Sequence, residues 1–329
     1  MESGKIVCGV WAFLLLVAVF VAVFSMVLNV PSVRGNGTII MINADGSIDP
    51  PTAPIQRDGD LYTLTDNIYG MIGVDRSNTT INGAGYTVQG TGASYSEYNG
   101  KWYDTSSGIY ISSIANNVRI ENTNIKGSQE GIYFEMFIAD SPPPNIFIPE
   151  NIVIHGNSIT NNNYGIVGYG SGGGVCSRNI TISGNTIENN GNNGIDLYHA
   201  ENTTLWGNTI INNGVGVNLP GVGGPSNNIL YHNNFINNTH QVGSGTGDTW
   251  DNGYPSGGNY WSDYTGADAN GDGIGDTPYS ISYYAQDRYP LMNPVGGVPS
   301  GGSNWPLIAG IVCVIVVIGI VATVYVRRR

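Results

Sequence analysis

The sequence predicts an all-β protein, a parallel β-helix with a transmembrane helix at each end. Two observations predict this fold class. The middle of the chain repeats short, β-branched runs bounded by Gly and Asn, and an uncharged apolar segment stands near each terminus. The runs are too short for helices, and a unit this small cannot bury its own apolar face. We therefore expect the units to stack into a solenoid.

The two apolar segments are residues 6–30 and 306–326, and neither contains a charged residue. About 20 apolar residues are enough for a helix to cross a bilayer. Residues 1–30 are therefore expected to form a signal anchor or a cleaved signal peptide, and residues 306–326 a transmembrane helix. Three arginines at 327–329 follow the second segment and Lys5 precedes the first, so the positive-inside rule places both ends in the cytoplasm.

Residues 31–305 are therefore expected outside the cell, attached to the cell membrane. This region holds 8 cationic and 23 acidic residues, a net charge of −15. Such a charge disfavours nucleic acid as a partner. Cys176 is the only cysteine of the region, so the chain cannot form a disulfide within it. Five N-x-Ser/Thr sequons are glycosylation candidates: Asn36, Asn78, Asn179, Asn202 and Asn237.

After an N-terminal cap region over residues 31–64, the repeats are expected over residues 65–247. In each unit one apolar residue is followed five positions later by another, and both should point into the core. The pairs are Ile81 and Tyr86, Ile120 and Ile125, Ile154 and Ile159, Ile182 and Ile187, Leu205 and Ile210, and Tyr231 and Ile236. A polar column three residues after the first apolar position should stack at the turns; it consists of Asn157, Asn185, Asn208 and Asn234, and upstream the same position holds Thr123 and Ala84, so the Asn column covers four units.

A second strand signal follows in each unit and begins at Gly108, Gly131, Gly165, Gly194 and Gly216. Equivalent strands of successive coils should pair about 4.8 Å apart. Gly and Asn at the corners supply the left-handed backbone that sharp turns need. These asparagines are interpreted as turn ladders and not as a binding site.

The stretches "ADGSIDPPTAPI", "INGAGYTVQG", the NIxIxGN coils and "GGNYWSDYTGADANGDGIGDTPY" resemble archaeal cell-surface proteins that carry NosD-type right-handed β-helix repeats. The resemblance spans about residues 38–294, and it implies a right-handed solenoid. The wider superfamily implies extracellular carbohydrate-binding proteins, polysaccharide lyases and glycosidases. NosD itself implies copper delivery to a reductase.

A glycine-rich loop carries oxygen ligands at near-alternate positions. It begins like an EF-hand loop, but its twelfth position is Tyr279 instead of Glu, so it is not an EF-hand. Hard oxygen donors favour Ca²⁺, which would order the cap without taking part in chemistry; the alternative is a metal-free acidic turn. The expected ligands are Asp268, Asn270, Asp272, the carbonyl of Ile274, and Asp276.

The loop lies in an aromatic C-terminal cap expected over residues 248–292, followed by a Pro/Gly/Ser-rich linker at 293–305. The cap either covers the apolar end of the solenoid or offers a platform on which sugars stack. Its aromatic residues are Trp250, Tyr254, Tyr260, Trp261, Tyr264, Tyr279, Tyr283, Tyr284 and Tyr289.

The sequence offers few residues that could bind copper or carry out catalysis. His155 and His232 are predicted to share an outward column, three coils and roughly 14 Å apart, too far to share a metal. The outward positions of the second strand read Tyr110, Tyr133, Val167, Asp196 and Asn218, with a single acid. No Lys or Arg occurs between Arg178 and Arg288, so we assign no catalytic residue.

The sequence therefore predicts a membrane-anchored extracellular β-helix protein with a structural or carbohydrate-binding role at the cell surface. Its expected partners are the membrane and envelope glycans. A polysaccharide lyase or glycoside hydrolase is the alternative, and a NosD-like copper-handling protein is a third possibility.

Overall fold

A computed structural model describes residues 37–91, 96–98, 101–103, 105–139, 145–170, 177–221, 226–245, 247–282 and 284–297. All of them belong to one compact unit, residues 36–329. The predicted transmembrane segments lie outside the described residues. Within the described part, no helix is long and apolar enough to cross a membrane.

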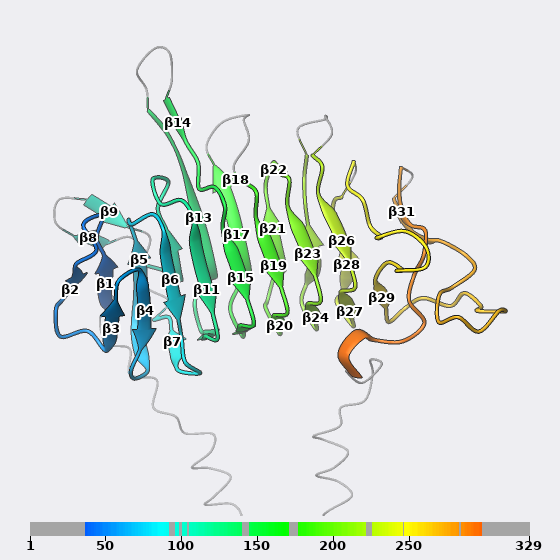
Figure 1. The fold of residues 1–329 in the computed structure, drawn as a ribbon, viewed down its shortest axis with the longest axis horizontal. Helices are drawn as coiled ribbons and strands as arrows, with labels where there is room; N and C mark the ends of the chain where they lie inside the picture. The colour runs from blue at the N-terminus through cyan, green and yellow to red at the C-terminus, as the bar shows by residue number, and fades with distance from the viewer. Residues whose placement is uncertain are drawn as a thin grey trace, which may run out of the picture. The chain divides into compact units, whose positions relative to one another are not determined.

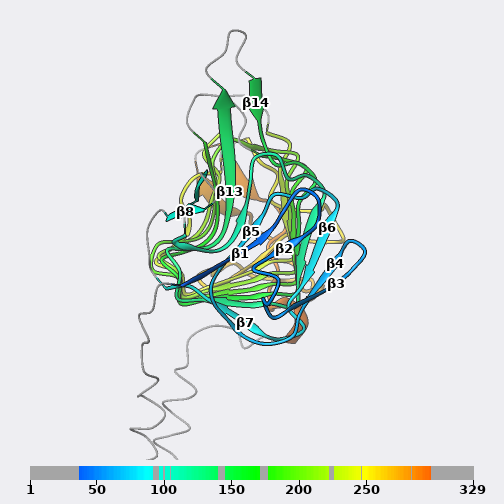
Figure 2. The same ribbon diagram turned by 90° about the vertical axis from the view of Figure 1, so that its left-hand side faces the viewer.

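The described chain is an all-β parallel solenoid, as predicted, and its strands recur in three walls (Figure 1). Viewed from the end that carries the first strands, the successive coils superpose (Figure 2). The walls are named here A, B and C. The one helical element described is the short 3-10 turn η1 (Val295–Gly297).

Wall A is formed by the longest strands. It comprises β1 (Thr38–Ile42), β5 (Ile68–Val74), β10 (Ser107–Ile111), β13 (Glu130–Ala139), β17 (Tyr164–Gly170), β21 (Asn193–Leu197), β25 (Val215–Asn218) and β28 (His240–Val242), each paired in parallel with the next. Parallel pairing thus starts at β1, inside the segment assigned from the sequence to the N-terminal cap region.

Wall B comprises β4 (Leu61–Leu64), β6 (Thr79–Asn82), β11 (Val118–Glu121), β15 (Val153–His155), β19 (Thr181–Ser183), β23 (Thr204–Trp206) and β26 (Ile229–Tyr231). Wall C comprises β7 (Thr87–Gln89), β12 (Asn124–Lys126), β16 (Ser158–Thr160), β20 (Thr186–Glu188), β24 (Thr209–Ile211), β27 (Asn234–Ile236) and β29 (Tyr260–Trp261).

The remaining strands lie beside the walls. They are β2 (Ile48–Asp49), β3 (Ile55–Asp58), β8 (Ser96–Tyr98), β9 (Lys101–Tyr103), β14 (Asn145–Phe147), β18 (Ser177–Arg178), β22 (Ala200–Glu201), β30 (Tyr279–Ser282) and β31 (Ala285–Asp287). Strand β14 pairs antiparallel with the end of β13, and β3 pairs antiparallel with β4.

The core consists of apolar columns that run from coil to coil. Ile154, Ile182 and Leu205 stack in wall B, and Ile159, Ile187 and Ile210 stack in wall C, as predicted. All six side chains are fully buried. Burying apolar surface is the dominant favourable contribution to folding, so these columns hold the coils together.

Two predicted pairs are wrong in register. In the last coil Leu230 and Phe235 point inward, not Tyr231 and Ile236. Since side chains alternate along a strand, a shift of one residue turns Tyr231 to the outer face. In the first predicted pair, the inward partner of Ile81 is Val88 and not Tyr86. The corner around Gly85 is two residues longer there than in the later coils. Tyr86, predicted inside, is 37 % exposed.

The GI motifs owe their glycine to the crowded inner corner of wall A. A Cβ on Gly165 would lie 2.3 Å from the carbonyl oxygen of Gly194 and 3.1 Å from a methyl of Ile187. Gly131 and Gly216 are similarly close to the next coil. Only glycine fits this position, because a side chain would push neighbouring coils apart.

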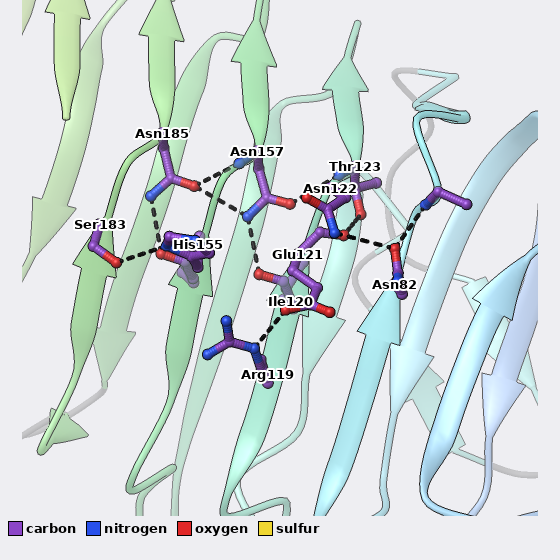
Figure 3. Close-up of polar contacts among 12 residues, drawn as sticks. Asn82, Arg119, Ile120, Glu121, Asn122, Thr123, His155, Asn157, Ser183 and Asn185 are labelled. Carbon is purple, nitrogen blue, oxygen red and sulfur yellow. Dashed lines mark hydrogen bonds and ion pairs between the residues drawn. The ribbon is translucent and has the colours of Figure 1, made fainter. Parts of the chain in front are cut away.

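The polar column forms a buried amide ladder, as predicted (Figure 3). The backbone N–H and Nδ2 of Asn157 donate to the Oδ1 of Asn185 at 2.9 and 3.1 Å. Asn185 donates in the same way to Asn208. The ladder continues through Asn233, not the predicted Asn234, to Asn259. These bonds satisfy polar groups that would be costly to bury alone.

A second buried ladder, which the sequence analysis did not identify, runs through Asn162, Asn190, Asn213 and Asn238. Both ladders end on an acceptor in the cap or last coil. Asn259 donates its backbone N–H to the carboxylate of Asp287 at 2.7 Å, and Asn238 donates its Nδ2 to the Oε1 of Gln241 at 2.9 Å. Every Asn in a ladder donates toward the C-terminal end, so the last position needs only to accept.

Candidate functional site

The acidic loop folds around its own carboxylates. Asp268 accepts hydrogen bonds from the backbone N–H groups of Gly271, Asp272 and Gly273 at 2.8 to 3.1 Å. Asp276 accepts one from Ala269 at 2.7 Å. Asp272 accepts one from Ile274, and that bond is the main cause that lowers the pKa of Asp272. These are the contacts of a tight Asx-type turn.

The structure brings no group of three or more His, Cys, Asp or Glu side chains together in metal-binding geometry within the described residues. Asn270 donates its Nδ2 to Asp272 at 3.0 Å, and Ile274 is mostly buried. Ca²⁺ binding by Asp268, Asn270, Asp272, Ile274 and Asp276 therefore stays a prediction.

The cap closes the solenoid with stacked rings. The ring of Phe235, an inward residue of wall C, lies nearly parallel to the indole of Trp261. The two ring centroids are 4.3 Å apart. Trp261 in turn stacks on Tyr279 at 4.2 Å. Trp250 and Trp261 are each 1 % exposed. These indoles cover the apolar end of the core, so they are not available as a platform for sugars; Tyr283 lies outside the described residues.

Asp287 connects this aromatic cover to the first amide ladder. Besides Asn259, it accepts the indole N–H of Trp261 at 2.9 Å and the backbone N–H of Tyr289 at 3.0 Å. Burial is the main cause that raises the pKa of Asp287 to about 6, although these hydrogen bonds lower it. The adjacent Asp251 forms a bidentate ion pair with Arg288.

The outer face of wall A carries the acid that the sequence analysis singled out. Asp196 is 1 % exposed and accepts hydrogen bonds from Asn193 at 2.7 Å and Asn218 at 2.9 Å. Three coils earlier, the buried Tyr110 contacts Glu135. Burial, with that hydrogen bond, strongly raises the pKa of Tyr110. These acids are held by neutral partners.

The outer face of wall B carries a column that the sequence analysis misread. Strand pairing aligns Glu121, His155, Ser183, Trp206 and Tyr231 on successive coils. His155 contacts the Ser183 hydroxyl at 3.0 Å, and Arg119 pairs with Glu121 at 2.6 Å (Figure 3). Trp206 is 41 % exposed and Tyr231 is half-buried. The Asn column could not show this register, because Leu230 and Tyr231 are each followed three residues later by an asparagine, Asn233 and Asn234.

The sequons that the structure describes lie at exposed corners. Asn78, Asn179 and Asn202 occupy one corner column, and Asn237 another, all with φ near +50°. Asn179 donates its Nδ2 to Asn151 at 3.1 Å. Asn36 lies outside the described residues.

Each of the five arginines in the described part is held locally. Arg76 pairs with Asp60, Arg119 with Glu121, Arg178 with Glu150 and Glu201, and Arg288 with Asp251, while Arg57 donates to the carbonyls of Gly46 and Gly59. Arg57 and Arg76 also line a polar pocket of about 500 Å³ near the first coil.

The profile of the family described as periplasmic copper-binding protein (NosD) matches residues 74–266, more than half of the 329-residue chain. The chain belongs to the NosD family. No curated protein matches the chain. Two crystal structures of the periplasmic alginate epimerase AlgG are similar to it. A mutant structure has 21 % identity and a TM-score of 0.37 over 53 % of this chain and 34 % of that one. The other has 19 % identity and a TM-score of 0.37 over 64 % and 40 %. The chain thus spans well under half of AlgG.

The family description implies copper, but the described residues of this NosD-family chain do not fit a copper site. His232 follows Tyr231 at the corner instead of sharing the column of His155, and its Nε2 contacts the carbonyl of Ser256 at 2.7 Å. His155 contacts Ser183, and His199 packs on Tyr198. No described histidine has a second imidazole, thiolate and carboxylate gathered around it.

Proposed function

We propose that this NosD-family chain is a membrane-anchored solenoid outside the cytoplasm that binds carbohydrate of the cell envelope. The observation that carries the proposal is the chemistry of the outer faces: Asn, Thr, Ser and aromatic side chains repeat at the coil spacing, while every described arginine is held by a local partner. Such a surface offers hydrogen bonds and ring faces to a repeating polymer and repels polyanions.

The family description of a periplasmic protein supports the location, and the apolar segments at residues 6–30 and 306–326 support membrane attachment. The test is a glycan array probed with the full-length protein. Binding to envelope-type polysaccharides is the expected result. Absence of binding to any glycan would overturn the carbohydrate role and leave a structural one.

Polysaccharide cleavage is a second candidate, favoured by the buried Asp196 and the contact of Tyr110 with Glu135 on wall A. A glycan that binds should be incubated with the protein and the products separated by size. Shortened or unsaturated products that disappear in Asp196→Asn would establish an enzyme. Unchanged glycan would leave binding as the function.

A further inference from the structure

We propose that the outer column of wall B is a binding site for a neutral, extended glycan, in which Trp206 and Tyr231 stack against sugar rings. The site is called here the wall B strip and comprises Glu121, His155, Ser183, Trp206 and Tyr231. The inference rests on the proposed carbohydrate function and names where on the molecule the sugar binds.

Trp206 occupies an unusual position for a large aromatic residue. It is the last residue of the regular parallel strand β23 and is 41 % exposed. The same position of the preceding coil is Ser183, so the fold does not need an aromatic residue there. Tyr231 is the direct neighbour in the following coil. Single exposed apolar residues are common on protein surfaces, but here two aromatic residues are in register on adjacent strands, which lie about 4.8 Å apart, so both can face one extended ligand.

The residues around the wall B strip hold it in place and leave it open to solvent. The imidazole of His232 lies edge-on to Tyr231 at 5.1 Å and is fixed by the Ser256 carbonyl. The corner beside the column is glycine in three coils, at Gly156, Gly184 and Gly207. A Cβ on Gly207 would meet no atom nearer than 3.9 Å, so no side chain stands over that edge.

The charge and the strand spacing of the wall B strip both suit a neutral, extended glycan. Arg119 neutralises Glu121, so the strip carries almost no net charge; this favours a neutral sugar over a uronate or a nucleic acid. The strand spacing is close to the length of one pyranose unit in an extended glycan. A polymer along the solenoid axis would thus place successive rings over Tyr231 and Trp206 and further hydroxyls over His155 and Glu121, while the buried Ser183 holds His155.

The experiment measures binding of full-length protein to neutral glucose, mannose and N-acetylglucosamine oligosaccharides, with polygalacturonate as the acidic comparison, by titration calorimetry. Trp206→Ala should weaken binding about tenfold or more, since an aromatic anchor of this kind is a typical binding hot spot. Trp206→Phe should keep most of the affinity. Tyr69→Ala is the matched control, because Tyr69 is 62 % exposed and pairs with Gln89 of wall C, not with the wall B strip. Melting temperatures check that the variants fold.

The outcomes separate the two proposals. If the wild type binds no glycan, the proposed function fails and the strip with it. If the wild type binds only polygalacturonate, or if Trp206→Ala binds neutral sugars as tightly as the wild type does, the proposed carbohydrate binding stands. The wall B strip is then overturned as its site. Sedimentation velocity adds one more outcome: if Trp206→Ala turns a self-associated protein into a monomer, the strip is a contact between two copies and the glycan site is overturned.

Discussion

Asparagine occupies two kinds of position in each coil, and they differ in burial and backbone. Those in the ladders, such as Asn185, are buried and exchange hydrogen bonds with the coil on either side. Those at the corners, such as Asn179, are exposed and hold φ near +56°. Asn suits both, since its amide both donates and accepts and its short side chain tolerates the left-handed region.

At the residue scale, Ile182→Asp should destabilise the solenoid by several kcal/mol. Ile182 is fully buried between Ile154 and Leu205, and an unpaired carboxylate in a dry core is strongly penalised. Thr181→Asp, one residue earlier on the outer face, should cost less than about 1 kcal/mol. Ser183, the next residue on the outer face, is a poorer control, because it is 3 % exposed beside His155. Chemical denaturation measures both; equal losses would contradict the register.

A second residue-scale prediction concerns pH. The pKa of Asp287 is raised to about 6 in the folded state, above its ordinary value of 3.8. The folded protein therefore binds a proton that the unfolded chain releases between about pH 4 and 6, and stability should fall as the pH rises through this window. The shift corresponds to about 3 kcal/mol at most.

Asp287→Asn should flatten this dependence, measured as the free energy of unfolding between pH 4 and 7. Burial also raises the pKa of Asp248, so part of the slope should remain. Asp58→Asn on the exposed strand β3 is the control and should keep the full slope. Stability that instead rises from pH 4 to 6 in the wild type would contradict the assignment.

At the element scale, the repeat predicted the middle coils, because the spacing of the inward residues is constant where Gly156, Gly184 and Gly207 follow the outward residue. It failed in the last coil, where His232 takes the left-handed corner with φ of +55° that Gly156, Gly184 and Gly207 take in earlier coils. With consecutive apolar residues and consecutive asparagines, two registers fit the sequence equally well. Only the requirement that Phe235 stack on Trp261 selects one of them. The same slip hid the pairing of Tyr231 with Trp206.

The acidic loop of residues 268–276 should bind Ca²⁺ and thereby stabilise the protein. Ca²⁺ should raise the melting temperature of the protein, since a ligand at 100 times its dissociation constant adds about 2.7 kcal/mol to the folded state. Asp272→Ala should abolish the rise, whereas Asp58→Ala should not change it. Mg²⁺ should act more weakly, because it demands octahedral geometry and sheds water reluctantly. A chelated and dialysed wild type that gains nothing from Ca²⁺ would leave the loop as an acidic turn held by Asp268.

At the scale of the whole molecule, the coils depend on their neighbours. Each wall pairs a strand only with the strands before and after it, so stability is shared along the stack and both ends must be closed. The C-terminal end is closed by the stack of Phe235, Trp261 and Tyr279 and by Asp287 at the end of a ladder. Sequence composition showed that an aromatic cap exists, but not which rings are buried, because that depends on contacts far apart in the chain.

The last prediction places the solenoid relative to the membrane. Residues 6–30 and 306–326 are long enough to cross a bilayer, and the net charge of −15 between them suits an aqueous compartment outside the cytoplasm. In a Cys176→Ser background, Tyr69→Cys introduces one exposed thiol on β5. A membrane-impermeant maleimide should label it in cells stripped of their outer layers but with an intact cytoplasmic membrane. The Cys176→Ser parent should stay unlabelled, because Cys8 and Cys313 lie within the apolar segments. Labelling of Tyr69→Cys only after the cytoplasmic membrane is permeabilised would place the solenoid inside the cell and remove envelope glycans as its ligands.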